Sequence, residues 1–249
     1  MKFRPLPLLL LATICLLPTL VQAEKTVASI INRSIEATGG RAAMEAIKNR
    51  HYRYMLNMPG LNQAASMELY HNAPDQMYIK TIMPVPGMPD GMVSEMVFSG
   101  NEGWMRDSIM GLRPVSEAEI ESSQMQSDFY LLLDFPERYP DAEYLGEMEF
   151  YGKQVDGVRV LGPGDQPASF YFDTTSGLLV GAELMAIQQG TQIPLKMAFR
   201  DFQELDAVKI PREMVVYNPM FEMIFEVISL NHNVEIPDGL FDKPEGLPE

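Results

Sequence analysis

The chain has 249 residues, of which 19 are Lys or Arg and 34 are Asp or Glu, so its formal net charge at pH 7 is −15. A surface this acidic repels phosphate backbones and anionic headgroups, which argues against nucleic-acid binding and against electrostatic docking on a membrane. The length suits one large domain or two small ones, and β-rich folds often reach this size as a single domain.

The N-terminal residues predict a secretory signal peptide over residues 1–23. Lys2 and Arg4 precede a short apolar run from Leu6 to Leu20, and Ala23 ends a small-residue cleavage site. These features are typical of a signal peptide, whereas the run is too short and too interrupted for a membrane span. We therefore expect a periplasmic protein that is not an integral membrane protein, with one mature domain over residues 24–249.

The cysteine content is consistent with this prediction. The only cysteine, Cys15, lies inside the predicted signal peptide, and Ile14 before it is not the small residue that a lipobox requires. The mature chain would then have neither a lipid anchor nor a disulfide. Its stability must come from its core alone.

Two helices are predicted ahead of the first strand. Residues 26–38 place their apolar side chains on one helical stripe, and the pair Gly39–Gly40 would end that helix in the left-handed geometry that glycine accepts. The residues of this stripe are Val27, Ile30, Ile31 and Ile35. A second short helix is predicted over residues 41–47, with Met44 and Ile47 as its apolar contacts.

From about Asn49 to Met105 the apolar period changes from 3.6 to 2, which predicts five antiparallel strands. Within this region the stretch Pro84–Gly91 contains three prolines and two glycines, so we expect a loop there. After it, Pro114 and the capping box formed by Ser116 and Glu119 predict a third helix over residues 114–133.

Strand alternation returns after Asp141 and persists nearly to the end of the chain, where the segment Pro237–Glu249 is expected to be loosely ordered. These patterns predict an α+β fold: a single curved antiparallel sheet of about 10–11 strands, with helices over its concave face. Because two or three helices can cover only part of that face, an apolar concave surface should remain. Six residues on the alternating apolar positions are candidates for its wall: Phe170, Phe172, Met197, Phe199, Met223 and Phe225.

Motifs of catalysis are absent from the sequence. There is no G-x-S-x-G nucleophile elbow and no Walker loop, and no histidine has the H-E-x-x-H spacing of a zinc site. We expect His51, His71 and His232 to be polar, outward residues of strands. The carboxylates of Glu147 and Glu149 would share one strand face, within reach of joint general acid/base work, but their Glu-Met-Glu setting indicates an exposed face. The sequence therefore predicts a protein that is not an enzyme and that needs no cofactor or metal.

Methionine is unusually frequent, with 18 residues after Met1. Thioethers are soft ligands for Cu(I), and Met83, Met88, Met92 and Met96 are candidates for such a cluster. Thioethers are also flexible and polarizable apolar groups, suited to a core or to a cavity wall that accepts ligands of variable shape. Since many of the methionines fall on the alternating apolar face, we favour a core or a cavity wall over copper.

Several segments together resemble a known family. They include A-T-G-G at Ala37–Gly40, F-Y-F-D-T-T-S-G-L-L-V at Phe170–Val180, D-A-V-K-I-P-R at Asp206–Arg212 and I-P-D-G-L-F-D-K-P at Ile236–Pro244. Over nearly the whole mature chain, the sequence resembles the outer-membrane lipoprotein-sorting-protein-like families, whose fold is the open half-barrel of the LolA/LolB carriers. These motifs are turn and strand signatures, so they indicate a fold rather than an activity.

The resemblance implies an apolar cavity, covered by helices, that accepts the acyl chains of a lipid or lipoprotein. We therefore expect a periplasmic binding or carrier protein for an apolar ligand. An alternative is a protein-interaction module of an envelope complex, acting through its acidic face or through an unpaired sheet edge.

Overall fold

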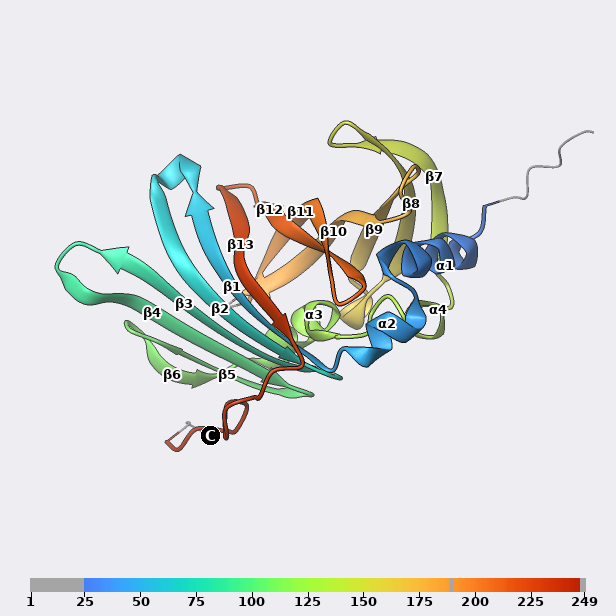
Figure 1. Cartoon of the computed structure of the whole chain (residues 1–249). Coiled ribbons are helices and arrows are strands. Elements are labelled where there is room, and N and C mark those ends of the chain that lie inside the picture. The colour runs from blue at the N-terminus through green and yellow to red at the C-terminus, as the bar shows by residue number, and fades with distance from the viewer. Residues whose placement is uncertain (1–24, 189, 247–249) are drawn as a thin grey trace, which may run out of the picture.

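The computed structural model describes residues 25–246 except residue 189, so the predicted signal peptide lies outside the described residues. The described strands form one antiparallel sheet of 13 strands, in the order β6-β5-β4-β3-β2-β1-β13-β12-β11-β10-β9-β8-β7 (Figure 1). This confirms the predicted curved antiparallel sheet. No helix in the described ranges is both long enough and apolar enough to cross a bilayer.

The sheet consists of two arms that meet at a single seam. The first arm comprises β1 Asn49–Met58, β2 Gln63–Asn72, β3 Gln76–Val85, β4 Met88–Ser99, β5 Glu102–Asp107 and β6 Gly111–Pro114. The second comprises β7 Glu143–Phe150, β8 Lys153–Leu161, β9 Pro167–Asp173, β10 Leu179–Gln188, β11 Thr191–Leu205, β12 Val208–Tyr217 and β13 Glu222–His232. Within each arm every strand pairs with its neighbour in sequence, and the seam is the antiparallel pair β1–β13.

The strand count exceeds the expected 10–11 partly because short strands such as β6 carry little alternation. The predicted loop Pro84–Gly91 is also wrong in most of its length. β3 continues to Val85 and β4 begins at Met88, so only a tight turn separates them. Prolines are tolerated here because Pro84 and Pro89 lie on the exposed hairpin end, where water can donate to a carbonyl that has no N–H partner.

Both predicted N-terminal helices form. Helix α1 (Val27–Thr38) has a capping box at Thr26 and ends at Gly39, whose φ of 137° favours glycine. Ile30, Ile31 and Ile35 are buried, as their shared stripe predicts. The short helix α2 (Arg41–Ala46) follows.

The third helix is shorter than predicted. α3 covers Glu117–Ser127 and begins with the predicted capping box, in which the backbone N–H of Glu119 donates to Ser116 Oγ at 3.4 Å and Glu119 accepts from the Ser116 backbone. Turns over residues 128–134 then lead to the single turn α4 (Phe135–Arg138). Asp128 ends α3 by taking an extended conformation.

α3 bridges the two arms across the concave side. Its residue Ile120 packs with Met77 and Phe98 of the first arm, while Met125 belongs to the core formed with the second arm. The N–H of Ile187 on β10 also donates to Ser122 Oγ at 3.1 Å. In Figure 1, α3 lies between the arms, whereas the β3–β4 hairpin extends far from every helix.

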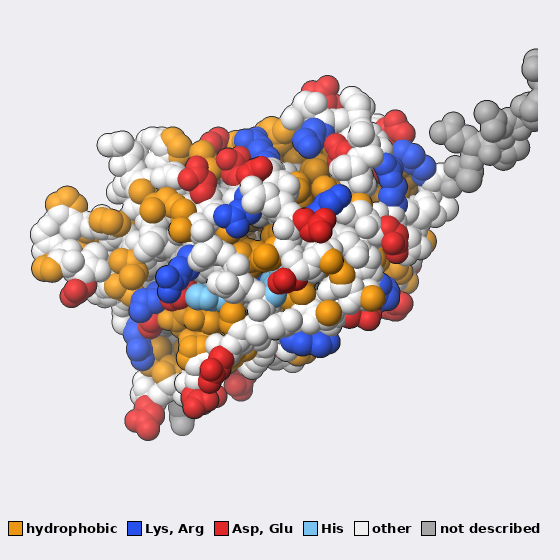
Figure 2. Space-filling view, viewed as in Figure 1, with side chains coloured by type: hydrophobic (Ala, Val, Ile, Leu, Met, Phe, Trp, Pro, Cys, Tyr) orange, Lys and Arg blue, Asp and Glu red, His pale blue; other side chains and the backbone are white. Residues whose placement is uncertain are grey.

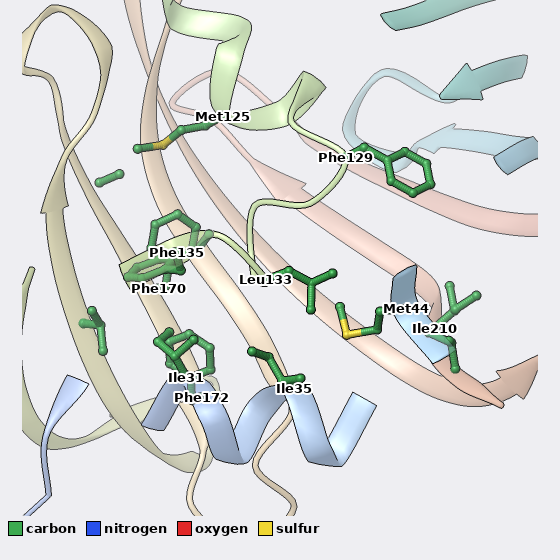
Figure 3. Packing of buried hydrophobic residues seen from close by; sticks show 14 of the residues in the cluster. Ile31, Ile35, Met44, Met125, Phe129, Leu133, Phe135, Phe170, Phe172 and Ile210 are labelled. Atoms are coloured by element: carbon green, nitrogen blue, oxygen red, sulfur yellow. The ribbon is translucent and has the colours of Figure 1, made fainter. Parts of the chain in front are cut away.

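The main core lies between the helices and the second arm (Figure 3). Ile31 of α1 packs with Phe172 of β9, and Phe135 meets the ring of Phe170 edge-on, with the ring centroids 5.4 Å apart. Met44 of α2 and Ile210 of β12 extend this core toward the seam. Burial of such side chains contributes about 1.5–3 kcal/mol each, which fixes the helical layer on this part of the sheet.

An ion-pair cluster secures the start of α1 to the edge of the second arm. Lys25 Nζ lies 2.8 Å from Asp156 and 2.6 Å from Glu147, and the Tyr144 hydroxyl donates to Asp156 at 2.8 Å. The hydrogen bond to Asp156 is the main reason that the pKa of Lys25 lies above its ordinary value. Because Asp156 is buried, its charge needs these two partners.

From Pro237 to Gly246, the last described residue, the tail has turns but no helix or strand. It lies against the convex side of the first arm, where Leu240 and Pro244 line a hollow of about 240 Å³ together with Tyr78 and Trp104.

Candidate apolar binding site

The concave face carries alternate residues of every strand, and the register identifies them. Tyr52 belongs to the core with the helices, so Tyr54, Leu56 and Met58 on the same strand face the same side. Direct pairing carries this face across the seam, since Phe225 lies opposite Leu56. Phe225 in turn lies opposite Met214 on β12.

All six candidate wall residues lie on this concave face, but in two different environments. Phe170 and Phe172 are 4% and 2% exposed and are covered by the helical layer. The other four lie on β11 and β13: Met197, Phe199, Met223 and Phe225. Of these, Phe225 is buried, while the other three are half-buried and reach solvent.

These four residues adjoin or belong to a cluster that contains no residue from a helix, and we call this cluster the open wall. Its buried members are Leu56, Ala65, Val216 and Phe225. Packed around them are Tyr54, Met67, Met83, Leu195, Met197, Met214 and Met223. Phe199 lies directly opposite Met214 and extends it. The open wall is thus a half-buried apolar surface built by β1, β2, β3, β11, β12 and β13, at the end of the sheet that the helices leave uncovered.

Methionine dominates the exposed part of this wall. Five of its seven half-buried members are methionines: Met67, Met83, Met197, Met214 and Met223. An unbranched thioether changes rotamer easily, so such a surface can close on itself or fit a guest of irregular shape.

The four methionines considered as copper ligands are not brought to one point. Met83 and Met92 are directly opposite each other, but Met96 faces Ile79 and Met88 lies at the exposed hairpin end. Along one extended strand, Met88 and Met96 are separated by roughly 25 Å. Of the four, Met83 and Met92 alone are directly paired across neighbouring strands, so only these two are placed to contact the same bound ligand.

The turns beside the open wall expose large apolar side chains. Because the sheet is an antiparallel meander, the β1–β2, β3–β4 and β12–β13 turns lie at the same end. They present Leu61, Met88 and Met220, which are 50%, 43% and 79% exposed. Figure 2 shows hydrophobic side chains gathered on the β3–β4 hairpin at the left of the view. A hollow of about 490 Å³ there is lined by Ile82, residues 84–86 and residues 88–91.

Polar groups also lie on the concave face, where the open wall borders the main core, which the helices cover and which we call the closed core. Tyr52 and Tyr54 are stacked, with centroids 5.2 Å apart, and Tyr54 contacts Phe225 edge-on. Burial raises the pKa of Tyr54 well above its ordinary value, so its phenol stays protonated and can donate. Arg212 is placed beside them, between Ile210 and Met214 on β12.

Two of the histidines are not outward residues as expected. His71 is buried on the concave face, where Nε2 lies 2.8 Å from the Ser127 carbonyl at the end of α3. The side chain of His232 is 1% exposed and Nδ1 lies 2.9 Å from Asp206. Only His51 fits the expectation, stacking on Tyr70 and pairing with Glu68. Strand parity would have placed His71 inward, because it lies opposite Arg50 on the Tyr52 face.

His71 should make the protein less stable in mild acid. Burial lowers its pKa from 6.5 to about 4, so between these values the unfolded chain binds a proton that the folded chain excludes. This contribution is fully present above pH 6.5 and is lost as the pH falls toward 4. We expect it to remove about 2 kcal/mol of unfolding free energy between pH 7.5 and pH 5.

Urea unfolding at the two pH values measures this loss, with the variant His71→Gln as the control. The variant should show a shallower decrease, since its amide does not titrate. Equal pH dependence in the two proteins would contradict a neutral, buried His71.

No group of three or more His, Cys, Asp or Glu within residues 25–246 could hold a metal ion. Glu147 is engaged with Lys25, and Glu149 is exposed, so the two carboxylates share no proton site. The arrangement that remains is an apolar wall with a small polar border.

Comparison with known proteins supports the fold. The sequence matches no protein-family model and no curated protein. Its structure is similar to a putative outer membrane lipoprotein-sorting protein domain from Vibrio parahaemolyticus, with TM-score 0.55 and 13% identity over 85% of this chain and 95% of that one. It is also similar to a DUF1329 family protein from Desulfovibrio piger, with TM-score 0.55 and 14% identity over 87% and 97% of the two chains.

A third similar structure is a LolA superfamily protein from Nitrosomonas europaea, with TM-score 0.55 and 11% identity over 88% of this chain and 99% of that one. These likenesses confirm the half-barrel fold that the sequence resemblance implies. At such identities they concern the fold, and the ligand must be argued from the residues of this chain.

Proposed function

We propose that this protein is a periplasmic carrier or binding protein for an apolar ligand, with the acyl chains of a lipid or lipoprotein as the guest. The observation that carries the proposal is the open wall, a methionine-rich apolar surface that the protein's own helices leave uncovered. A wall of this kind is costly in water unless something apolar covers it. Two proteins of similar structure, a putative outer membrane lipoprotein-sorting protein domain and a LolA superfamily protein, support the same interpretation.

The proposed contact set is narrower than the six residues named from the sequence. Phe170 and Phe172 support the floor of the closed core, whereas Met197, Phe199, Met223 and Phe225 would touch the ligand. The exposed turns at Leu61, Met88 and Met220 would border its entrance.

Burial of alkyl groups supplies enough free energy for such a function. Each methylene removed from water contributes about 0.8 kcal/mol, so ten of them give about 8 kcal/mol before the entropy of association is subtracted. Micromolar affinity needs about 8 kcal/mol, so a saturated chain of 12–18 carbons would bind with a Kd of about 1–100 μM. The binding requires no catalysis.

The test is to purify the mature chain and analyse bound lipid by mass spectrometry after organic extraction. The delipidated protein is then titrated with the neutral fluorescent probe N-phenyl-1-naphthylamine and with dodecanol as a competitor. We expect saturable probe binding that dodecanol reverses. Protein that carries no lipid and ignores both compounds would overturn the proposal, and a stoichiometric protein partner found by periplasmic crosslinking would then favour the interaction-module alternative.

A further inference from the structure

We infer that the ligand of this site is an anionic amphiphile, whose carboxylate or phosphate head is held by Arg212 at the inner border of the open wall. The inference rests on the proposed function and deepens it by naming the class of head group. It starts from an unusual placement, because a guanidinium lies on an otherwise apolar face of a strand.

Arg212 is fixed on the concave face by its strand. β12 is regular from Val208 to Tyr217, so residues 208, 210, 212, 214 and 216 face one side. Ile210 belongs to the closed core and Met214 packs on the open wall, so Arg212 lies between the two. Its Nη2 donates to the Val227 carbonyl at 2.7 Å, and Val227 is the residue directly opposite Tyr54.

Most of the N–H donors of Arg212 are not used within the described part of the protein. A guanidinium has five N–H donors, and among the described contacts the side chain uses Nη2 alone, on a neutral carbonyl. No carboxylate in the described part of the chain lies within ion-pair distance of it, although the chain has 34 acidic residues. A positive charge that faces an apolar surface without a counter-ion favours an anion brought in by a ligand.

A second guanidinium adds to the positive field. Arg50 lies on the same face of β1 as Tyr52 and Tyr54 and extends over the ring of Phe129, with Cζ 4.3 Å from the centroid. It too has no carboxylate partner among the described residues, and its Nε is buried without a hydrogen-bond partner. Both arginines act electrostatically on Tyr54. Both charges therefore lie near the stacked pair of Tyr52 and Tyr54, whose hydroxyls can donate to an anion held there.

The geometry matches an amphiphile lying along the concave face. An alkyl chain on the open wall, against Met214, Met223 and Phe225, would place its head toward Arg212 at the wall's inner end. Anionic head groups gain charge-assisted hydrogen bonds there, whereas a neutral alcohol gains only ordinary ones. Carboxylate and phosphate head groups share this chemistry, so the experiment must show which of the two is preferred.

The experiment compares head groups on a constant chain. Displacement of N-phenyl-1-naphthylamine is measured with dodecanoate, dodecyl phosphate and dodecanol, and with inorganic phosphate alone, on the wild-type protein and the Arg212→Gln variant. We expect the wild type to bind the preferred anion about tenfold more tightly than dodecanol. In the variant the ratio of the two affinities should fall close to one, mainly because the anion binds less tightly, while affinity for dodecanol should fall much less.

The Arg212→Lys variant keeps the positive charge and should retain part of the preference for the anion. This result separates a role of Arg212 in anion binding from a structural role through its hydrogen bond to the Val227 carbonyl. A wild-type protein that binds all three amphiphiles equally would overturn the inference and leave the proposed function intact. Failure to bind any of them would instead overturn the proposed function. Displacement by inorganic phosphate alone would show that the anion site works without an acyl chain and would contradict the amphiphile assignment.

Discussion

Replacing Phe135 with alanine is expected to lower the free energy of unfolding by about 3–5 kcal/mol. Phe135 is 1% exposed and meets Phe170 edge-on, and it belongs to the core shared by the helices and the second arm. Truncation would leave a cavity under the segment between α3 and β7, which has few regular hydrogen bonds to compensate. The loss is measured by urea unfolding followed by far-UV circular dichroism.

Phe199→Ala provides the matched control for this prediction. Phe199 is half-buried on β11 and lies outside the main core, so its truncation should cost about 1 kcal/mol or less. A similar loss in both variants would mean that the open wall is packed as firmly as the closed core. That result would also argue against a site left available for a ligand.

Replacing Met223 with aspartate is expected to weaken binding of an alkyl probe about 30-fold or more. Met223 is half-buried in the open wall, where it lies directly opposite Val216. A carboxylate at this position must lose water to let an alkyl chain approach, which costs at least about 2 kcal/mol, or close to 30-fold in affinity. Stability should change less, because the new charge reaches solvent when no ligand is bound.

Ile228→Asp on the same strand is the control for charge and for strand propensity. Ile228 is 61% exposed and lies at the irregularity in the β1–β13 pairing, next to the inward residue Val227. The Ile228→Asp variant should therefore bind the probe with an affinity within about twofold of the wild type. Equal losses in the two variants would place the apolar guest somewhere other than the open wall.

Much of this architecture follows from local patterns in the sequence. The stripe of Ile30, Ile31 and Ile35 gave α1, and the capping box at Ser116 gave the start of α3. Strand parity placed all six candidate residues on one face, because a period of two is a strong constraint wherever a strand buries one side. Their role in ligand contact stays a prediction.

What local patterns could not give is which part of the face the helices cover. That depends on the turns over residues 128–134, which place Phe135 on Phe170 rather than farther along the sheet. The prediction of a loop over Pro84–Gly91 was wrong because the exposed end of a hairpin tolerates proline. Arg212 was missed because the wall candidates were taken from apolar residues alone, although its parity with Ile210 and Met214 indicates the concave face.

The seam between β1 and β13 has a consequence for how the chain folds. Each arm is a meander whose neighbours in space are neighbours in sequence, so each can form through short loop closures. The seam instead joins residues such as Arg50 and His232, which are separated by most of the chain, and the entropy of closing so long a loop makes this pairing a late step. Until then the unpaired edges of β1 and β13, with their methionine-lined surfaces, are open to association with other chains, so a newly made chain is most prone to aggregate in that interval.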